Sequence, residues 1–160
     1  MTPAGCSDDP WDMCRKRCQS VIERVVLLEI AAAYPPLFSE PPMLCPTREF
    51  MKAFLDPGNG HKLAIFPQYQ FGRHRVDFAL AYRRSSDRRV FFVVVECDGA
   101  AFHDAEKDSA RDRDLKDGFP IFKIVRLPAK LINLDRRAAA DIVRDAVEEM
   151  QRFFAENADG

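Results

Sequence analysis

The sequence has little of what defines several large protein classes. Its apolar runs fall short of the ~20 residues that a membrane-spanning helix needs, and its N-terminus shows no secretory signal pattern. Its net charge is only −1, so any binding of nucleic acid must come from a local patch. Repeats and low-complexity tracts are also absent. We therefore expect a single cytoplasmic domain over residues 1–160, with residues 1–8 as a tail and no membrane partner.

Ligands typical of transition-metal sites are few: three histidines and five cysteines. An odd number of cysteines without an export signal favours reduced thiols over a disulfide framework. Cys14 and Cys18 would share one helical face, and with Cys6, Cys45 or His61 they could form a zinc site. That spacing is not the one found in standard zinc fingers. Reduced thiols are the expected state and zinc binding is the alternative.

The chain does contain a strongly apolar run, VFFVVV at 90–95, which predicts a central strand buried on both faces. Glu96 and Asp98 follow it and would point to the same side of the strand, because side chains alternate. Burying two carboxylates is costly unless a cation accompanies them. A divalent metal held by oxygen ligands is the simplest such cation.

The N-terminal third reads as helix. Asp9 and Pro10 form a helix start, and the helical pattern runs to about residue 34, where two prolines stop it. Ser20 and Glu23 have the spacing of a capping box, which indicates two helices with a break near Ser20. Glu23 also lies near the apolar stripe. It is either a capping residue or an acid that points into a functional site.

A long loop follows over 35–61, rich in proline and glycine, with a short helix at 47–55. Strands are expected at 62–71, 75–82 and 90–97. A helix at 104–117 ends at Gly118, a strand covers 119–126, and a final helix runs from Asp135 to about Ala155. This order predicts an α/β sandwich with a mixed sheet.

Two features of the first hairpins suggest function. Val76, Phe78 and Leu80 alternate with Asp77, so this acid should face away from the bulky residues in mid-strand, which is unusual. The second feature is the loop at 83–89. Its four arginines form either a solvated turn or a contact to backbone phosphates. They are Arg83, Arg84, Arg88 and Arg89.

Together these residues resemble the PD-(D/E)xK nuclease superfamily. The matching pattern is Asp77 in RVDF, a hairpin, ECDGAAFH at 96–103, then RDRD at 111–114 and LKDG at 115–118. The likeness is greatest to very-short-patch-repair-like endonuclease domains, including those appended to DNA helicases. It covers about residues 20–132.

The resemblance implies a restriction-endonuclease-like three-layer sandwich with an αβββαβ core, here with an extra C-terminal helix. It implies a Mg²⁺- or Mn²⁺-dependent endodeoxyribonuclease that cuts or nicks DNA. DNA is the implied partner, with a helicase or another repair or restriction factor. Asp98 stands where the superfamily usually has lysine, which leaves the general base unassigned.

The resemblance also assigns roles to individual residues. Asp77, Glu96 and Asp98 would hold the metal, helped by Glu23. His103 would transfer a proton or contact the scissile phosphate, and Lys107 could supply the missing cation. The residues expected to contact nucleic acid are Gln68, Arg83, Arg84, Arg88, Arg89 and Arg111.

Two alternatives remain open at this point. Arg111 and Arg113 can equally pair with neighbouring acids. The whole domain can also be a non-catalytic nucleic-acid-binding or protein-interaction module on the same fold. The near-neutral charge favours this second class, whereas the intact set of acids favours the enzyme.

Overall fold

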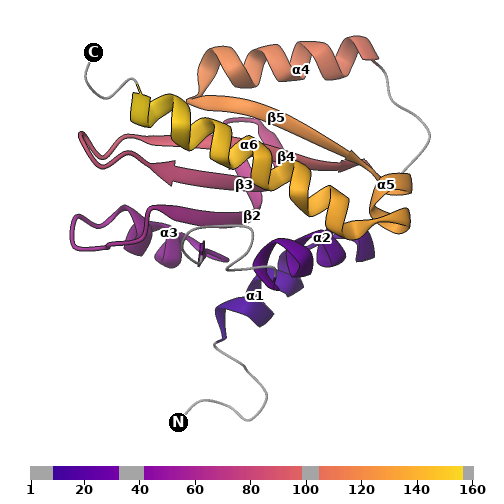
Figure 1. Cartoon of the computed structure of the whole chain (residues 1–160), viewed down its shortest axis with the longest axis horizontal. Coiled ribbons are helices and arrows are strands. Elements are labelled where there is room, and N and C mark those ends of the chain that lie inside the picture. Colours follow the sequence, from indigo (N-terminus) through magenta and orange to yellow (C-terminus); the bar gives the residue numbers. More distant parts are fainter. Residues whose placement is uncertain (1–8, 33–41, 99–104, 157–160) are drawn as a thin grey trace.

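The computed structural model describes residues 9–32, 42–98 and 105–156 (Figure 1). Its elements in chain order are α1 (Pro10–Arg17), α2 (Val21–Ala32), β1 (Met43–Leu44), α3 (Arg48–Leu55), β2 (Leu63–Phe71), β3 (His74–Arg83), β4 (Val90–Asp98), α4 (Ala105–Gly118), β5 (Ile121–Pro128), α5 (Ala129–Leu134) and α6 (Arg136–Glu156). The strands form one sheet in the order β1-β2-β3-β4-β5. The outer pairs β1–β2 and β4–β5 are parallel and the inner pairs are antiparallel. The predicted α/β architecture with a mixed sheet is therefore confirmed.

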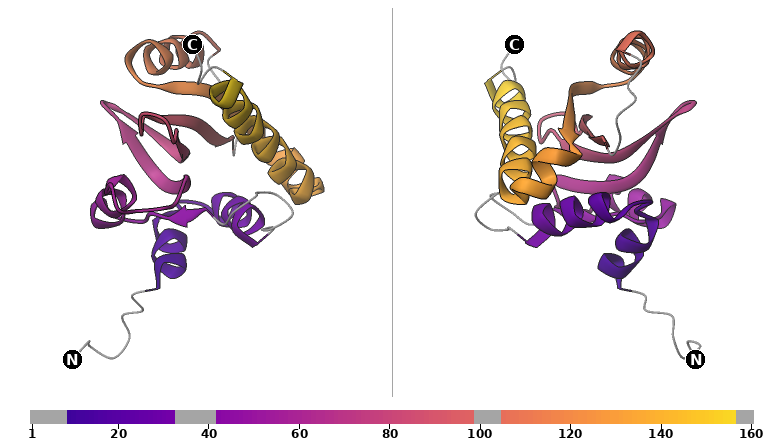
Figure 2. Two further views of the ribbon diagram at one scale, coloured as in Figure 1. Left: turned by 60° about the vertical axis from the view of Figure 1, so that its left-hand side comes forward. Right: turned by 90° about the vertical axis from the view of Figure 1, so that its right-hand side faces the viewer.

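Helices cover both faces of the sheet. Apolar side chains of α2 and α6 pack on one face against Ile65, Phe78, Leu80, Val93 and Val95. On the other face, Phe54 of α3 and Leu115 of α4 pack against alternate positions of the same strands. Figure 2 shows α3 and α6 on opposite sides of the sheet. β4 is buried from both sides at residues 93–95, as its apolar run predicts, whereas residues 90–92 are half-buried.

The N-terminal helices divide where the capping box predicts. The backbone N–H of Glu23 donates to Ser20 Oγ at 3.1 Å, and the Gln19 N–H donates to Glu23 Oε2 at 2.9 Å. These contacts satisfy N–H groups that a helix start leaves without partners. The break lets α1 and α2 take different directions below the sheet (Figure 1). None of the described helices is long and apolar enough to cross a membrane.

Two short elements differ from the expectation. Met43 and Leu44 form the edge strand β1, which is too short to show periodicity in the sequence. The sequence predicts no element between the strand at 119–126 and the helix from Asp135, but in the structure Pro128 precedes α5, a helix of 6 residues. The final helix begins as predicted, since Asp135 Oδ1 accepts the Ala138 N–H at 3.0 Å.

The alternation of side chains in β3 changes at Asp77. Phe78 packs on the face of α2 and α6, and Ala79 on the opposite face, as alternation requires. Val76 packs on the same face as Ala79, so the prediction that it shares a face with Phe78 is wrong. On the neighbouring strand, Gln68 has φ of 51°, in the left-handed region that side chains rarely adopt. The two irregularities lie opposite each other, because the β2–β3 register has no regular pair between Gln68 and Asp77.

Candidate active site

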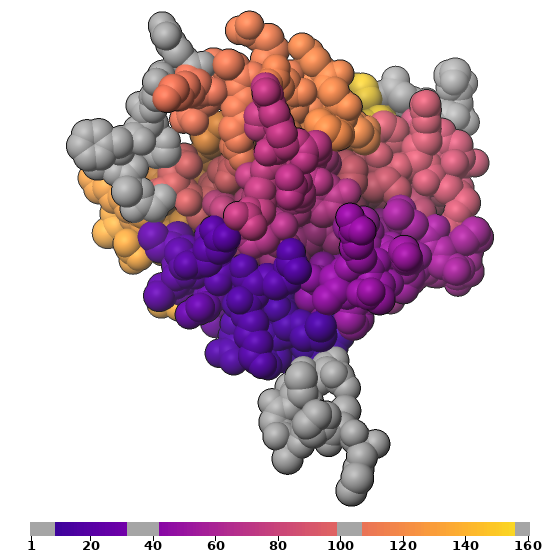
Figure 3. Space-filling view, turned by 180° about the vertical axis from the view of Figure 1, so that it is seen from behind, coloured from indigo at the N-terminus to yellow at the C-terminus, as the bar shows by residue number. Residues whose placement is uncertain are grey.

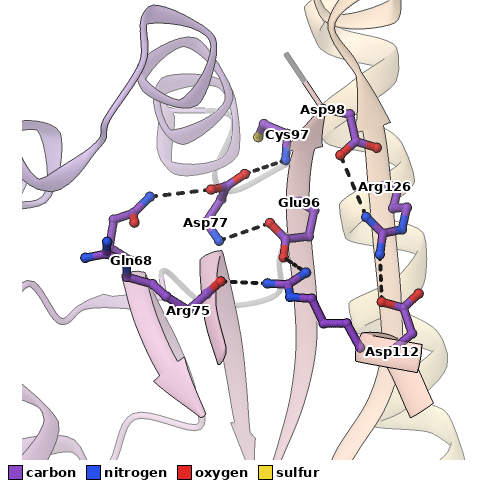
Figure 4. Close-up of polar contacts among 9 residues, drawn as sticks. Gln68, Arg75, Asp77, Glu96, Cys97, Asp98, Asp112 and Arg126 are labelled. Carbon is purple, nitrogen blue, oxygen red and sulfur yellow. Dashed lines mark hydrogen bonds and ion pairs between the residues drawn. The ribbon is translucent and has the colours of Figure 1, made fainter. Parts of the chain in front are cut away.

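Asp77 and Glu96 lie opposite each other on β3 and β4, one position beyond the last regular pair, Phe78 with Val95. At this point hydrogen bonds from backbone N–H groups to side chains replace the backbone hydrogen bonds between β3 and β4 (Figure 4). The Asp77 N–H donates to Glu96 Oε2 at 3.4 Å, and the Cys97 N–H donates to Asp77 Oδ2 at 2.8 Å. The Glu96 carboxylate is thus held by the backbone of Asp77, and the Asp77 carboxylate by the backbone of Cys97, the residue after Glu96. The predicted proximity of these two acids is confirmed.

Gln68 extends this row onto β2, where it lies opposite Asp77 between two regular β2–β3 pairs. Its Nε2 donates to Glu23 Oε2 at 2.9 Å and approaches Asp77 Oδ1 at 3.5 Å (Figure 4). Gln68 and Glu23 are both only 6% exposed. The capping role of Glu23 is confirmed, and the same carboxylate accepts a hydrogen bond from Gln68. It caps α2 and also reaches the acid row, where it orients Gln68.

Arg111 of α4 brings a positive charge to Glu96. Its Nη1 lies 2.5 Å from Glu96 Oε1, and its Nη2 donates to the carbonyl of Arg75 at 2.6 Å. The contact to Oε1 is an ion pair without hydrogen-bond geometry, since this buried oxygen has no hydrogen-bond partner. Pairing with an acid, one of the two alternatives for Arg111, is what the structure has.

The pKa of Glu96 is raised from 4.5 to about 7, first because burial penalises the charged form and also because Asp77 is a nearby negative charge. Arg111 opposes this increase. Glu96 therefore changes its protonation in the neutral range, and any cation that binds there shifts it to the charged form.

Asp98 belongs to a different contact. Its Oδ1 lies 3.8 Å from Arg126 Nη1 on β5, while Arg126 Nη2 donates to Asp112 Oδ1 at 2.6 Å (Figure 4). The expectation that Asp98 joins Asp77 and Glu96 in one cluster is wrong. Positions two residues apart on a strand are separated by about 6.6 Å, which is enough for Asp98 to reach the neighbouring strand's arginine instead.

His103, the expected proton-transfer residue, lies outside the described residues, as do Gly99 and Cys6. Lys107 is described and is exposed on α4. Arg111, one turn further along α4, is the cation that contacts Glu96. The role expected for Lys107 stays a prediction, and Arg111 adds a second basic residue of the same helix at Glu96.

Arg83 is not part of an exposed tip. It is only 5% exposed, and its guanidinium donates to the carbonyls of Phe54, Asn59 and His61. β3 extends to Arg83, which places this side chain beneath α3 and the loop that follows it. The prediction of a phosphate contact from Arg83 is therefore wrong, because its donors already bind the protein.

The remaining arginines of the loop differ from one another. Arg84 forms an ion pair with Asp87 at 2.5 Å and lies 5.3 Å above the ring centroid of Phe91. Arg88 donates to a backbone carbonyl at 3.1 Å yet stays exposed, and the Arg89 side chain is 72% exposed. Only Arg88 and Arg89 present guanidinium groups to the solvent at this end of the hairpin.

The thiols do not form the alternative zinc site within the described chain. Cys14, Cys18 and Cys45 are buried and free, and burial raises the pKa of each to about 12. A protonated thiol is a poor metal ligand. Over residues 9–32, 42–98 and 105–156, no three His, Cys, Asp or Glu residues come together closely enough to hold a metal ion.

The pair Asp77 and Glu96 nonetheless fits a hard divalent cation. Mg²⁺ is usually held by one or two carboxylates, with water and substrate phosphate oxygens in its other positions. Two carboxylates from neighbouring strands meet this requirement, and a cation bound there would share Glu96 with Arg111, whose Nη1 lies 2.5 Å from Oε1. The donor set suits Mg²⁺ or Mn²⁺ better than zinc, which prefers nitrogen and sulfur.

Sequence reasoning missed Arg126, although a signal was present. It is one of two charged residues in strand β5, the other being Lys123, and it lies in register with Glu96. Comparison of the chain with protein-family models, curated proteins and solved structures gave no match.

The geometry of this site and its sequence pattern are therefore the observations that bear on function.

Proposed function

We propose that this protein is a metal-dependent DNA endonuclease with a restriction-endonuclease-like fold. The observation that carries the proposal is the pair Asp77 and Glu96, set opposite each other where the β3–β4 ladder opens. The succession α2-β2-β3-β4-α4-β5 supports the fold assignment, because it corresponds to the αβββαβ core implied by the sequence pattern.

In this proposal Asp77 and Glu96 hold Mg²⁺ or Mn²⁺. A bound divalent cation supplies neutralisation of the negative charge on the attacking water and the phosphate. Gln68 holds Asp77 in place through Oδ1, and Glu23 holds Gln68. Both are positioning residues. Arg111 places a guanidinium beside Glu96, where it can also contact a phosphate oxygen.

The other assignments remain parts of the proposal. His103 transfers a proton or contacts the scissile phosphate, and Lys107 adds positive charge near the strand. Arg88 and Arg89 contact the DNA backbone without reading sequence, because no rigid element accompanies them into a groove. The partners are DNA and a helicase or another repair or restriction factor.

A plasmid-nicking assay tests the proposal. Supercoiled plasmid is incubated with the protein and Mg²⁺ or Mn²⁺, with and without EDTA. We expect conversion to open circles only when the free metal is present. Cleavage that persists in EDTA would contradict metal dependence. The absence of cleavage with both metals and with nicked, single-stranded and duplex substrates would contradict the enzyme.

The second candidate is a non-catalytic nucleic-acid-binding or protein-interaction module. The 2.5 Å contact between Arg111 and Glu96 favours it, since a guanidinium already neutralises the acid that would hold the metal. The two candidates differ in one measurement. A module binds DNA with no metal-dependent increase in melting temperature, whereas the enzyme gains stability from Mn²⁺ through mass action.

A further inference from the structure

A pocket of about 430 Å³ lies beside the acid row, between α1, the start of α3 and the β2–β3 pair. Figure 3 shows these three parts of the chain meeting on one face of the molecule, α1 in indigo, α3 in purple and the hairpin in magenta. The volume falls in the range of small-molecule sites. Its lining residues are Arg17, Cys45, Pro46, Thr47, Arg48, Met51, Phe66, Pro67, Gln68, Tyr69, Gln70 and Arg75.

The lining carries charge of one sign. Arg17, Arg48 and Arg75 come from three different elements, and the lining contains no acid. All three arginines are exposed, and none forms an ion pair with a carboxylate among the described residues. Three guanidinium groups line the pocket and only Arg48 has an acid nearby, Glu49, among the described residues, so the pocket favours an anion, above all a phosphate, as the ligand.

The start of α3 adds to this preference for an anion. Thr47 is the N-cap residue and its side chain makes no capping hydrogen bond. The carboxylate of Glu49 lies at this helix start, and its pKa is lowered by hydrogen bonds from its own backbone N–H and from Thr47. The Glu49 carboxylate already interacts with the positive end of the α3 dipole. The three arginines therefore provide most of the electrostatic attraction for a ligand phosphate.

One wall of the pocket is aromatic. Tyr69 is half-buried and lines it, and Phe66, only 3% exposed, packs behind Tyr69 with the ring centroids 5.3 Å apart. Aromatic rings bind unpaired nucleobases by stacking, independently of sequence. Arginines beside aromatic rings therefore match the two halves of a nucleotide, the phosphate and the base.

Gln68 connects the pocket to the acid row. It lines the pocket, and its Nε2 approaches Asp77 Oδ1 at 3.5 Å. Its φ of 51° places a side chain in a sparsely populated conformation at this junction, as is often found at functional sites. A DNA strand that lies along Asp77 and Glu96 therefore brings its next nucleotide to the pocket.

We propose that this pocket binds an unpaired nucleotide of the DNA strand next to the scissile phosphodiester, with Arg17, Arg48 and Arg75 on its phosphates and Tyr69 beside its base. The inference rests on the proposed nuclease function, whose substrate it specifies. A base that stays stacked in a duplex cannot enter the pocket, whereas an unpaired base can. The preferred substrates are thus single strands and the unpaired segments of partly paired DNA.

Binding of a fluorescein-labelled oligodeoxythymidylate, followed by fluorescence anisotropy in EDTA, tests this. The wild type should bind the single strand more tightly than the same strand paired with its complement. Arg17→Ala and Arg48→Ala should each weaken single-strand binding about tenfold, the cost of one charge-assisted hydrogen bond. Each should also reduce the slope of log K against log salt by about 0.7.

Arg152→Ala is the matched control, because this exposed arginine lies on α6, on the other face of the sheet. It should change neither the affinity nor the salt slope. Arg48→Lys should recover part of the affinity lost in Arg48→Ala. An unchanged melting temperature in each variant shows that a loss of binding is not a loss of fold.

Equal losses of affinity in Arg48→Ala and Arg152→Ala would contradict the claim that the pocket is the binding site, because the loss would then reflect only the change in net charge. Equal affinity for single-stranded and duplex DNA would contradict the claim that the pocket binds an unpaired nucleotide. EDTA excludes cleavage, so failure of the nuclease does not affect this result. Binding through the pocket without any nicking activity would contradict the proposed function alone.

Discussion

Glu96 combines burial with a nearby like charge, and both raise its pKa to about 7. A carboxyl with a higher pKa in the folded than in the unfolded chain binds its proton more tightly when folded. Its contribution to the free energy of unfolding is complete below about pH 4.5 and is lost as the pH rises to about 7. Neutral Gln at this position has no such dependence.

We therefore expect the free energy of unfolding of the wild type to fall between about pH 4 and about pH 8 relative to that of Glu96→Gln, by at most about 3 kcal/mol. Urea unfolding of both proteins at the two pH values measures this difference. Identical pH profiles would show that Glu96 has an ordinary pKa. The difference should diminish when Mn²⁺ is present, since a bound cation favours the charged form.

Arg83 has a structural role that its neighbours lack. Its donors bind three backbone carbonyls, and its guanidinium lies 5.1 Å from the ring centroid of Phe54. Arg83→Ala should reduce the free energy of unfolding by about 2–4 kcal/mol, because buried carbonyls lose their partners. Arg89→Ala, at the exposed end of the same loop, is the control and should cost under about 0.5 kcal/mol. Equal costs would contradict the buried position of Arg83.

The junction of α1 and α2 supports both the fold and the site. Ser20→Ala removes the oxygen that accepts the Glu23 N–H, and should cost about 1 kcal/mol of stability. It also frees the Glu23 carboxylate, which holds Gln68. Gln19→Ala leaves the capping box intact and serves as the control, since it is the Gln19 backbone that makes the contact. Equal melting temperatures for the two variants would contradict the capping role.

Elements with strong local signals were predictable from the sequence. The capping box at Ser20, the apolar run of β4 and the proline-bounded helices determine structure over a few residues each. β1 and α5 were missed because two and six residues are too few to show a period. The irregularity at Gln68 was also missed. It involves a backbone conformation that no residue preference encodes.

The proximity of Asp77 and Glu96 was predictable, because a hairpin makes their strands neighbours and the alternation of side chains indicates the face on which each acid lies. Their partners were not, since Arg111 and Arg126 reach the site from α4 and β5 across the fold. The basic loop was misread for a related reason. The sequence shows four arginines close together, yet only the packing of α3 against the end of β3 decides that Arg83 is inside.

Over the whole molecule, basic and acidic residues nearly balance, with a net charge of −1. Affinity for DNA should therefore come from local clusters of basic residues. Replacing Arg88 and Arg89 together by Ala should weaken duplex binding and reduce its salt slope by about 1.8, because two phosphate contacts are lost. The loss should not depend on sequence. Anisotropy titrations over a range of salt concentrations measure it, with Arg84→Ala as the control whose guanidinium pairs with Asp87. An unchanged slope would show that the loop is only a turn.

In the proposed function, Asp77 and Glu96 together hold the catalytic metal. The most direct measurement compares plasmid nicking in Mn²⁺ with the Mn²⁺-dependent increase in melting temperature, for the wild type, Asp77→Asn, Glu96→Gln and the exposed control Asp145→Asn. Both site variants should lose nicking and the metal-dependent increase, and their metal-free melting temperatures should be equal to or above that of the wild type, because mutual repulsion is removed. The control should match the wild type. Full nicking by Asp77→Asn, with an unchanged response to Mn²⁺, would contradict the claim.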